Sequence, residues 1–202
     1  MSRRTEEKEA KRARIHTAAK RLFADKGFAG TTIAEIARAA NVGTGPVFLY
    51  APDKGALLAQ VFCSEVDRVQ QTAFRRIDRS LTFERKLMKL LTAFFDYYGK
   101  DQHLARVFLK ELLFSSRQSP EVASATHRFV GLIAALAAEG AAAGEVRGDV
   151  DPFYVAAIVF GVYWTSVTAW LAGSLPSKKT ALAHLQTALH IVMTGVAARS
   201  LR

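Results

Sequence analysis

Apolar residues recur at intervals of three and four along almost the whole chain, which is the spacing of one face of an α-helix. The first proline is Pro46, and 5 prolines in 202 residues leave room for long uninterrupted helices. No stretch alternates apolar and polar residues around a two-residue turn, which is the pattern of a β-hairpin. The sequence therefore predicts an all-α protein.

Three helices are expected in the N-terminal part, at residues 6–25, 33–39 and 44–50. Gly27 is expected to end the first helix, because glycine adopts the left-handed conformation found after helix C-termini. Residues 41–43, Asn-Val-Gly, form a short turn between the second and third helices. Two helices joined by a tight turn that contains glycine are typical of a helix-turn-helix.

The ends of these short helices have recognisable signals. Thr32 and Glu35 have the spacing of a capping box, in which each side chain bonds to the other's backbone N–H. Pro46 would lie in the first turn of the third helix, where its missing N–H costs little. The second and third helices are therefore expected to be short and well defined.

Longer helical patterns follow, separated by glycine, proline and serine. We expect six more helices, at residues 54–79, 82–98, 102–114, 120–140, 151–172 and 177–200. The predicted organisation is thus an N-terminal helix-turn-helix domain over residues 1–54 and a C-terminal six-helix domain over residues 55–202.

The charge of the chain points to a polyanionic partner. The net charge is +10 and the isoelectric point is near 10. Residues 1–54 hold 11 basic and 6 acidic residues, and the much longer part 55–202 holds 17 and 12. The positive charge is therefore densest on the predicted helix-turn-helix, where nucleic acid or an anionic membrane surface would dock.

The single cysteine, Cys63, excludes an internal disulfide and favours a reducing compartment. The first 20 residues are rich in Arg and Lys but contain no apolar run, so they do not have the pattern of a secretory signal. We expect the protein to be cytoplasmic.

Residues 15–62 resemble the DNA-binding domain of TetR-family transcriptional regulators. The resemblance rests on the segments IHTAAKRLFADKGF at 15–28, TTIAEIARAANV at 31–42 and GTGPVFLYAPDKGALL at 43–58, in this spacing. It implies a homodimer, in most members a repressor, whose helix-turn-helix binds a palindromic operator on double-stranded DNA. It also implies that a small ligand in the C-terminal domain weakens DNA binding.

The resemblance assigns DNA contacts to particular residues. Thr32 is assigned to a phosphate. The other residues lie on the third helix or, for the last one, four residues after its end: Thr44, Gly45, Pro46, Phe48, Tyr50 and Lys54. This chain departs from the family pattern in having Gly43 where Ser is usual, Pro46 where Thr is frequent and Phe48 where Tyr is usual.

The third helix lacks Arg, Asn and Gln, the side chains that make bidentate contacts with bases. We therefore expect few direct base contacts, with further affinity from a basic N-terminal arm on phosphates or in a minor groove. The arm comprises Arg3, Arg4, Lys8, Lys11 and Arg12. The alternatives are that the threonines only cap a helix, that the arm is a solvated tail, and that Val47 and Phe48 belong to the core.

The segment 153–175 contains 23 residues without a charge, enough to span a bilayer or to form a buried helix. We favour a buried helix of a bundle, and no membrane, because four Ser and Thr residues interrupt the segment. The following helix has two apolar stripes, which implies two packing partners. By resemblance, the last two helices pair with those of a second subunit.

The expected effector is a small apolar or aromatic molecule in the C-terminal domain. The candidate ligand-binding residues are aromatic or sulfur-containing: Phe62, Met88, Phe95, Tyr98, Phe108, Phe129, Tyr163 and Trp164. The alternative for each residue is core packing.

The sequence contains no pattern that predicts catalysis, a metal site or a cofactor. The five histidines do not pair at the spacing of metal ligands, and Gly43-Thr44-Gly45 lacks the third glycine of a dinucleotide-binding loop. We therefore predict a regulator rather than an enzyme. The alternative function is a helical carrier or sensor of apolar molecules whose basic end meets a membrane surface or a partner.

Overall fold

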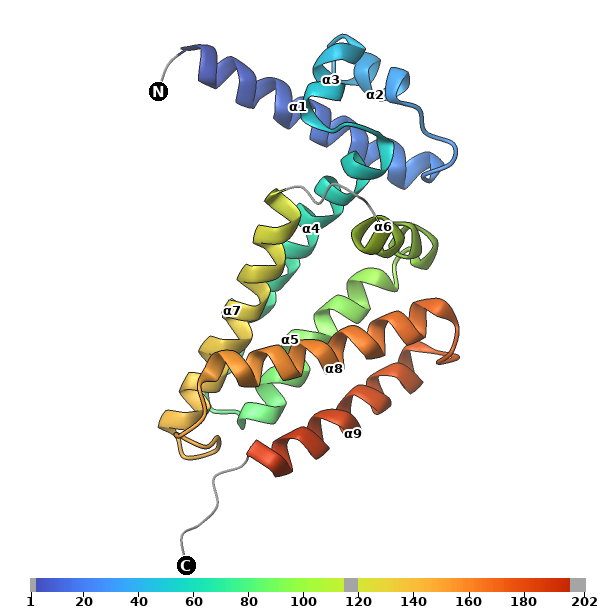
Figure 1. Cartoon of the computed structure of the whole chain (residues 1–202). Helices are drawn as coiled ribbons and strands as arrows, with labels where there is room; N and C mark the ends of the chain where they lie inside the picture. Colours follow the sequence, from blue (N-terminus) through green and yellow to red (C-terminus); the bar gives the residue numbers. More distant parts are fainter. Residues whose placement is uncertain (1–2, 115–119, 197–202) are drawn as a thin grey trace, which may run out of the picture. The chain divides into compact units, whose positions relative to one another are not determined.

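The computed structural model describes residues 3–114 and 120–196, and within them the chain forms helices and no strands (Figure 1). The helices are α1 (Arg3–Lys26), α2 (Ile33–Ala39), α3 (Thr44–Tyr50), α4 (Lys54–Arg75), α5 (Phe83–Tyr98), α6 (Gln102–Phe114), α7 (Pro120–Ala142), α8 (Pro152–Ala172) and α9 (Lys178–Val196). The predicted all-α class is confirmed.

Two helix ends differ from the prediction. Helix α1 begins at Arg3 rather than at residue 6, so the basic arm is itself helical. Helix α4 ends at Arg75 rather than at residue 79. The reason is a local turn in which the Asp78 carboxylate accepts hydrogen bonds from the backbone N–H and the hydroxyl of Ser80, at 2.9 and 2.7 Å. The predicted end of the last helix, at residues 197–200, lies outside the described residues.

The chain divides into two compact units. Unit 1 comprises Met1–Glu65 and His103–Ala123, and unit 2 comprises Val66–Gln102 and Ser124–Arg202. Helix α4 supplies its first half to unit 1 and its second half to unit 2. A domain boundary after residue 54 remains a prediction from the sequence.

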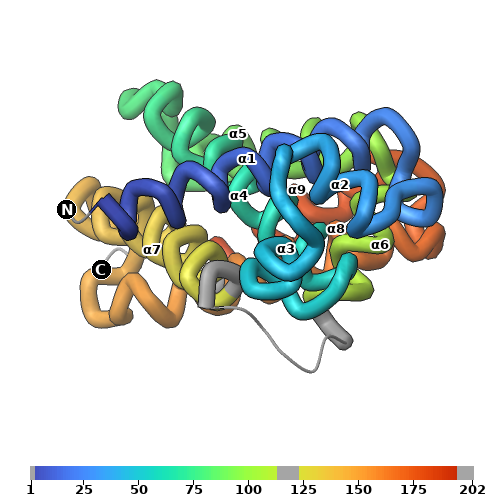
Figure 2. The backbone as a smooth tube through the Cα atoms, turned by 90° about the horizontal axis from the view of Figure 1, so that it is seen from above, coloured from blue at the N-terminus to red at the C-terminus, as the bar shows by residue number. Residues whose placement is uncertain are grey.

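In unit 1, α2 and α3 lie beside the C-terminal half of α1, and the N-terminal half of α1 extends beyond them (Figure 2). The buried residues of α1 begin only at Ile15, which explains this extension. The turn between α2 and α3 includes Asn41 with a φ of 52°, a left-handed conformation that asparagine tolerates better than most residues. These features give the predicted helix-turn-helix.

In unit 2, α8 packs against α9. The Asp151 side chain caps α8, and Gly173 ends it with a φ of 90°. Helix α8 is the one helix of the described residues that is long and apolar enough to cross a membrane. Buried residues such as Val159, Tyr163 and Val167 place one of its faces in the core of unit 2. This agrees with the predicted bundle helix.

Candidate nucleic-acid interface

Helix α3 buries one narrow side and exposes the rest. Val47 is buried, and so is Ala51, the residue that directly follows the helix. The side chains of Phe48 and Leu49 are 52% and 91% exposed. Because this unit has a helix-turn-helix, the exposed side of α3 is the surface that can enter a major groove.

The predicted residues Thr44, Gly45 and Pro46 are all exposed at the N-terminal end of α3. Phe48 is not a core residue, which removes the alternative considered from the sequence. Leu49 was missed as a contact candidate. The spacing of Val47 and Ala51 was the signal for it, since Leu49 lies on the opposite side of the helix.

A groove of about 640 Å³ separates the N-terminal half of α1 from α3. Its α3 side is formed by Pro46, Leu49 and Tyr50, and its α1 side by Ile15, Glu7 and four basic residues. We call these four the α1 cations: Arg4, Lys8, Lys11 and Arg12. The groove therefore combines a basic wall with the exposed side of the recognition helix.

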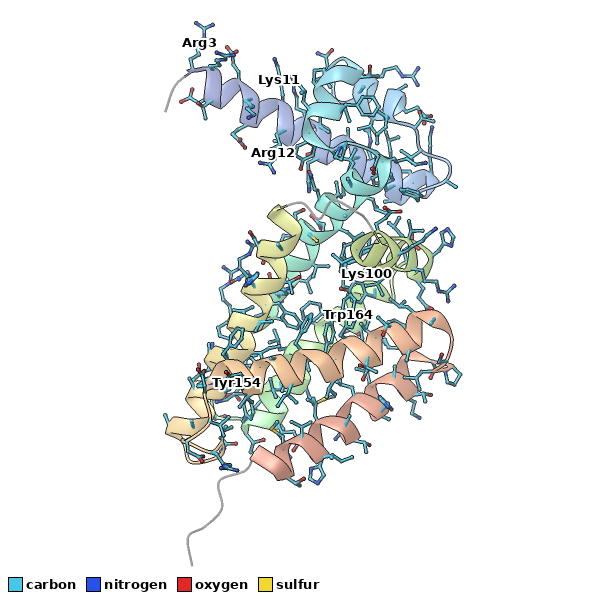
Figure 3. The ribbon with its side chains drawn as sticks, viewed as in Figure 1. Arg3, Lys11, Arg12, Lys100, Tyr154 and Trp164 are labelled. Atoms are coloured by element: carbon cyan, nitrogen blue, oxygen red, sulfur yellow. The ribbon has the colours of Figure 1, made fainter. Side chains whose placement is uncertain are left out.

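The basic arm belongs to helix α1, and it contacts α3 through Arg12. The Arg12 guanidinium lies over the Tyr50 ring, 5.0 Å from its centroid. Arg3 and Arg4 are exposed near the free end of α1, and Figure 3 shows Arg3 there with Lys11 farther along the helix. Of these predicted residues, the structure places Arg4, Pro46 and Tyr50 around one groove.

Thr32 caps α2 through the predicted capping box. Its hydroxyl accepts a hydrogen bond from the Glu35 backbone N–H at 3.2 Å, and its own N–H and hydroxyl donate to Glu35 Oε2, both at 2.9 Å. Lys26 Nζ donates to Glu35 Oε1 at 2.7 Å. Both Thr32 donors that a phosphate would use are thus bound to a carboxylate, and the phosphate role of Thr32 stays a prediction.

The hydrogen bond from Lys26, together with those from Thr32, lowers the pKa of Glu35 to about 2. The carboxylate therefore stabilises the folded state above its ordinary pKa of 4.5. This contribution is lost as the pH falls from about 4.5 towards 2.

Replacing Glu35 by Gln should therefore flatten the loss of stability in this acidic range. Thermal unfolding of wild type and of Glu35→Gln is measured from pH 5 to pH 2. The quantity compared is the melting temperature of wild type minus that of the variant at each pH. The difference should shrink as the pH falls. A constant difference across the range would show that the Glu35 charge does not contribute. The comparison with wild type removes the effects of Asp78 and Asp149, whose pKa values are also lowered by their hydrogen bonds.

Lys54 has a structural role that the sequence did not reveal. Its ammonium donates to the carbonyl oxygens of Phe28 and Thr31, at 2.8 and 2.9 Å. It also lies 4.4 Å from the centre of the Phe28 ring. Lys54 thus fixes the start of α4 to the loop between α1 and α2, and its predicted phosphate contact would have to use the remaining N–H.

Further polar contacts attach α4 to the helix-turn-helix. Gln60 Nε2 donates to the carbonyl of Tyr50 at 3.2 Å, at the end of α3. His16 Nε2 lies 2.6 Å from Ser64 Oγ, and burial lowers the pKa of His16. Helix α4 therefore holds both α1 and α3 by specific hydrogen bonds.

The interior of unit 2 contains a group of contacting aromatic side chains. We call it the aromatic cluster: Phe94, Phe95, Tyr98, Phe129, Phe160 and Tyr163. The Tyr163 hydroxyl lies 3.5 Å from that of Tyr98. Burial raises the pKa of Tyr163 well above its ordinary value, so the phenol remains neutral.

The structure gathers four of the eight predicted ligand residues in this cluster: Phe95, Tyr98, Phe129 and Tyr163. Trp164 stacks on Phe160 at its edge, with ring centres 6.0 Å apart. Phe62 and Phe108 stack on each other in unit 1, 4.5 Å apart, and Met88 is half-buried. Phe94 and Phe160 were missed, because helical spacing does not tell which aromatic residues meet across helices.

Comparison with known families accounts for both parts of the chain. Residues 15–61 match the model described as bacterial regulatory proteins of the tetR family. Residues 62–195 match the model described as the C-terminal region of YsiA-like proteins, so a single match covers most of the chain. The chain belongs to the TetR family. It is a DNA-binding transcriptional regulator with a helix-turn-helix, as the sequence predicted.

Relatives of this TetR-family protein include regulators of lipid metabolism. The fatty acid metabolism regulator protein of Bacillus subtilis is 22% identical over 191 residues, which cover 94% of this chain and 97% of that protein. The matched relatives are transcriptional regulators rather than enzymes.

Two solved structures share the fold over nearly the full length. Thermus thermophilus FadR, a TetR-family repressor in complex with lauroyl-CoA, is 24% identical with a TM-score of 0.76, covering 94% of this chain and 96% of that one. Bacillus subtilis FadR in complex with stearoyl-CoA is 21% identical with a TM-score of 0.65, covering 91% and 98%. At these identities the likeness shows the fold.

Proposed function

We propose that this TetR-family protein is a cytoplasmic homodimeric repressor that binds a palindromic operator and is released from it by a long-chain acyl-CoA. The observation that carries the DNA-binding part is the groove in which the α1 cations face the exposed side of α3. A duplex in the major-groove orientation places α3 on base edges, and the basic wall then lies beside a phosphate strand.

Base contacts in this arrangement are few and partly apolar. Thr44 offers one hydroxyl, and Pro46, Phe48 and Leu49 offer surfaces that suit thymine methyl groups. Phosphate contacts from the α1 cations supply the larger share of the affinity. Arg3 and Arg4, near the free end of α1, are the residues we assign to the flanking backbone or minor groove.

The proposed effector follows from the interior of unit 2 and from the relatives. The aromatic cluster is apolar except for the hydroxyls of Tyr98 and Tyr163, which suits a long alkyl chain with a polar end. Lauroyl-CoA and stearoyl-CoA are bound by the two FadR structures of the same fold. Helix α4 supplies residues to both units, so it is the element through which effector binding would change the recognition helix.

The proposed dimer uses an exposed face of α8 and α9. Ser166 Oγ on α8 lies 3.2 Å from His184 Nδ1 on α9. Each of these residues is nine positions from Leu175, which lies in the segment that connects the two helices. In this antiparallel register Ile158 and Ile191 lie at the same level. They are 49% and 65% exposed, and Tyr154 is 65% exposed one turn before Ile158 (Figure 3). Such an apolar face on a regulator suits an isologous interface.

Selection of bound duplexes from random DNA tests the operator, and titration of the selected complex with lauroyl-CoA tests the effector. We expect a palindromic site, and a rise in Kd for that site of at least about tenfold at saturating lauroyl-CoA, together with a higher melting temperature. Stabilisation by lauroyl-CoA with unchanged operator affinity would refute the coupling. Recovery of no symmetric site would favour the carrier function.

A further inference from the structure

One buried polar group of α4 is not explained by the fold. Among the described residues, two buried side-chain oxygens have no hydrogen-bond partner, Gln60 Oε1 and Gln70 Oε1. The Gln60 amide is still used, because its Nε2 donates to Tyr50. Gln70 is only 2% exposed and belongs to unit 2. A buried carbonyl oxygen without a donor destabilises a protein, so its presence calls for a compensating role.

Gln70 occupies a core position on its helix. It is on the same stripe of α4 as Val66, four residues before it, and Cys63, seven residues before it, and both are buried. An apolar side chain of the same length would suit this stripe. The adjacent Gln71 is only half-buried, so the polar character of position 70 does not follow from solvent exposure.

The level of Gln70 along unit 2 is fixed by an ion pair one turn earlier. Asp67 Oδ1 lies 3.0 Å from Nε of Arg128, which joins α4 to α7. The residue after Arg128 is Phe129, whose ring centre lies 4.5 Å from that of Phe94 and 5.3 Å from that of Tyr163. At this level α7 contributes to the aromatic cluster. Gln70 therefore brings an unpaired hydrogen-bond acceptor into the interior of unit 2, one turn along α4 from the level at which α7 contributes Phe129 to the cluster.

We propose that Gln70 is the polar anchor of the effector site. Its amide oxygen accepts a hydrogen bond from an N–H or O–H donor on an otherwise apolar effector. This inference rests on the proposed function and assigns a residue that distinguishes the proposed acyl-CoA from the corresponding free fatty acid. An ionised fatty acid has an alkyl chain but no donor, whereas the pantetheine arm of an acyl-CoA has amide N–H groups next to the thioester. Gln70 thus selects the acyl-CoA over the free acid.

The test compares wild type with Gln70→Met and with the matched control Gln71→Met. Methionine keeps an unbranched side chain of similar length and removes the amide. Without ligand, Gln70→Met should melt about 3 °C higher than wild type, because an unpaired buried acceptor is gone. Gln71→Met should melt close to wild type.

Calorimetric titration with lauroyl-CoA and with dodecanoate completes the experiment. Lauroyl-CoA should bind Gln70→Met about tenfold more weakly than wild type and Gln71→Met as wild type does. Dodecanoate should not distinguish wild type from Gln70→Met. A higher melting temperature with lower lauroyl-CoA affinity is the combination that a purely structural residue would not give.

The outcomes that overturn the inference are distinct from failure of the proposed function. Equal lauroyl-CoA affinity of wild type and Gln70→Met would overturn the role of Gln70 and leave the acyl-CoA proposal intact. A Gln70→Met protein that is less stable or fails to fold would show that the amide is structural, which also overturns it. Absence of lauroyl-CoA binding to wild type would overturn both.

Discussion

Replacing the four α1 cations by glutamine is expected to weaken operator binding by on the order of a hundredfold at physiological salt. All four line the groove beside α3, so each is placed to neutralise a phosphate when α3 lies in the major groove. Each phosphate contact that is lost lowers the slope of log affinity against log salt by about 0.9. Binding measured by fluorescence anisotropy at several salt concentrations should therefore show a slope smaller by about 3 to 4.

The expected loss is uniform over DNA sequences. Phosphate contacts position the protein but do not distinguish bases, so specific and non-specific duplexes should lose affinity in similar proportion. A loss confined to the specific site would instead indicate base contacts from α1, as in minor-groove recognition. The experiment thus separates the two roles considered for the arm.

A matched control removes the same charge elsewhere. Arg75, Arg76, Lys89 and Lys179 are exposed residues of unit 2, and their replacement by glutamine also lowers the net charge by four. If the control variant lost as much affinity and slope as the α1 variant, the effect would be due to overall charge. The groove would then have no special part in DNA binding. A circular-dichroism melt of both variants checks that loss of the Arg12–Tyr50 contact has not unfolded unit 1.

Local features of the fold were predictable because their physical cause lies within a few residues. The capping box of Thr32 and Glu35 depends on a spacing of three, and the end of α1 depends on Gly27, which has a φ of 69°. The start of α3 at Thr44 was predicted from the Asn-Val-Gly turn at residues 41–43. The structure shows all of these where the sequence predicted them.

Features that depend on contacts between distant segments were not predictable. Lys54 lies four residues after the end of α3, which suggested a phosphate contact, but its ammonium binds carbonyls 26 and 23 residues earlier in the chain. Gln70 and Gln71 form a polar pair in the sequence, and only the rotation of α4 decides which of them is buried. The same holds for Phe62 and Phe108, which stack on each other in unit 1, whereas the aromatic cluster belongs to unit 2.

Placing lysine at both Ile158 and Ile191 is expected to convert the proposed dimer to a monomer. In an isologous interface each position occurs twice, so four ammonium groups would be buried or driven apart. We expect the dimer Kd to rise at least about a hundredfold, which corresponds to about 3 kcal/mol. Sedimentation velocity over a range of protein concentrations measures this change directly.

Operator affinity should fall with the dimer, also by at least about a hundredfold, because a monomer engages only one half-site. The choice of lysine makes this result diagnostic. Two added positive charges would by themselves strengthen attraction to DNA, so a loss of binding cannot arise from charge. A duplex with a single half-site should bind the variant and wild type with similar affinity, since unit 1 is unchanged.

Ala135 and Ala138 on the exposed side of α7 provide the control for surface lysines on unit 2. Lysine at both positions adds the same charge and should leave the protein dimeric and bound to the operator. If this control dissociated and the Ile158 and Ile191 variant stayed dimeric, the interface would lie on α7. If both variants stayed dimeric, the exposed apolar face of α8 and α9 would need another partner. The two variants therefore decide which helices bring the two recognition helices to one palindrome.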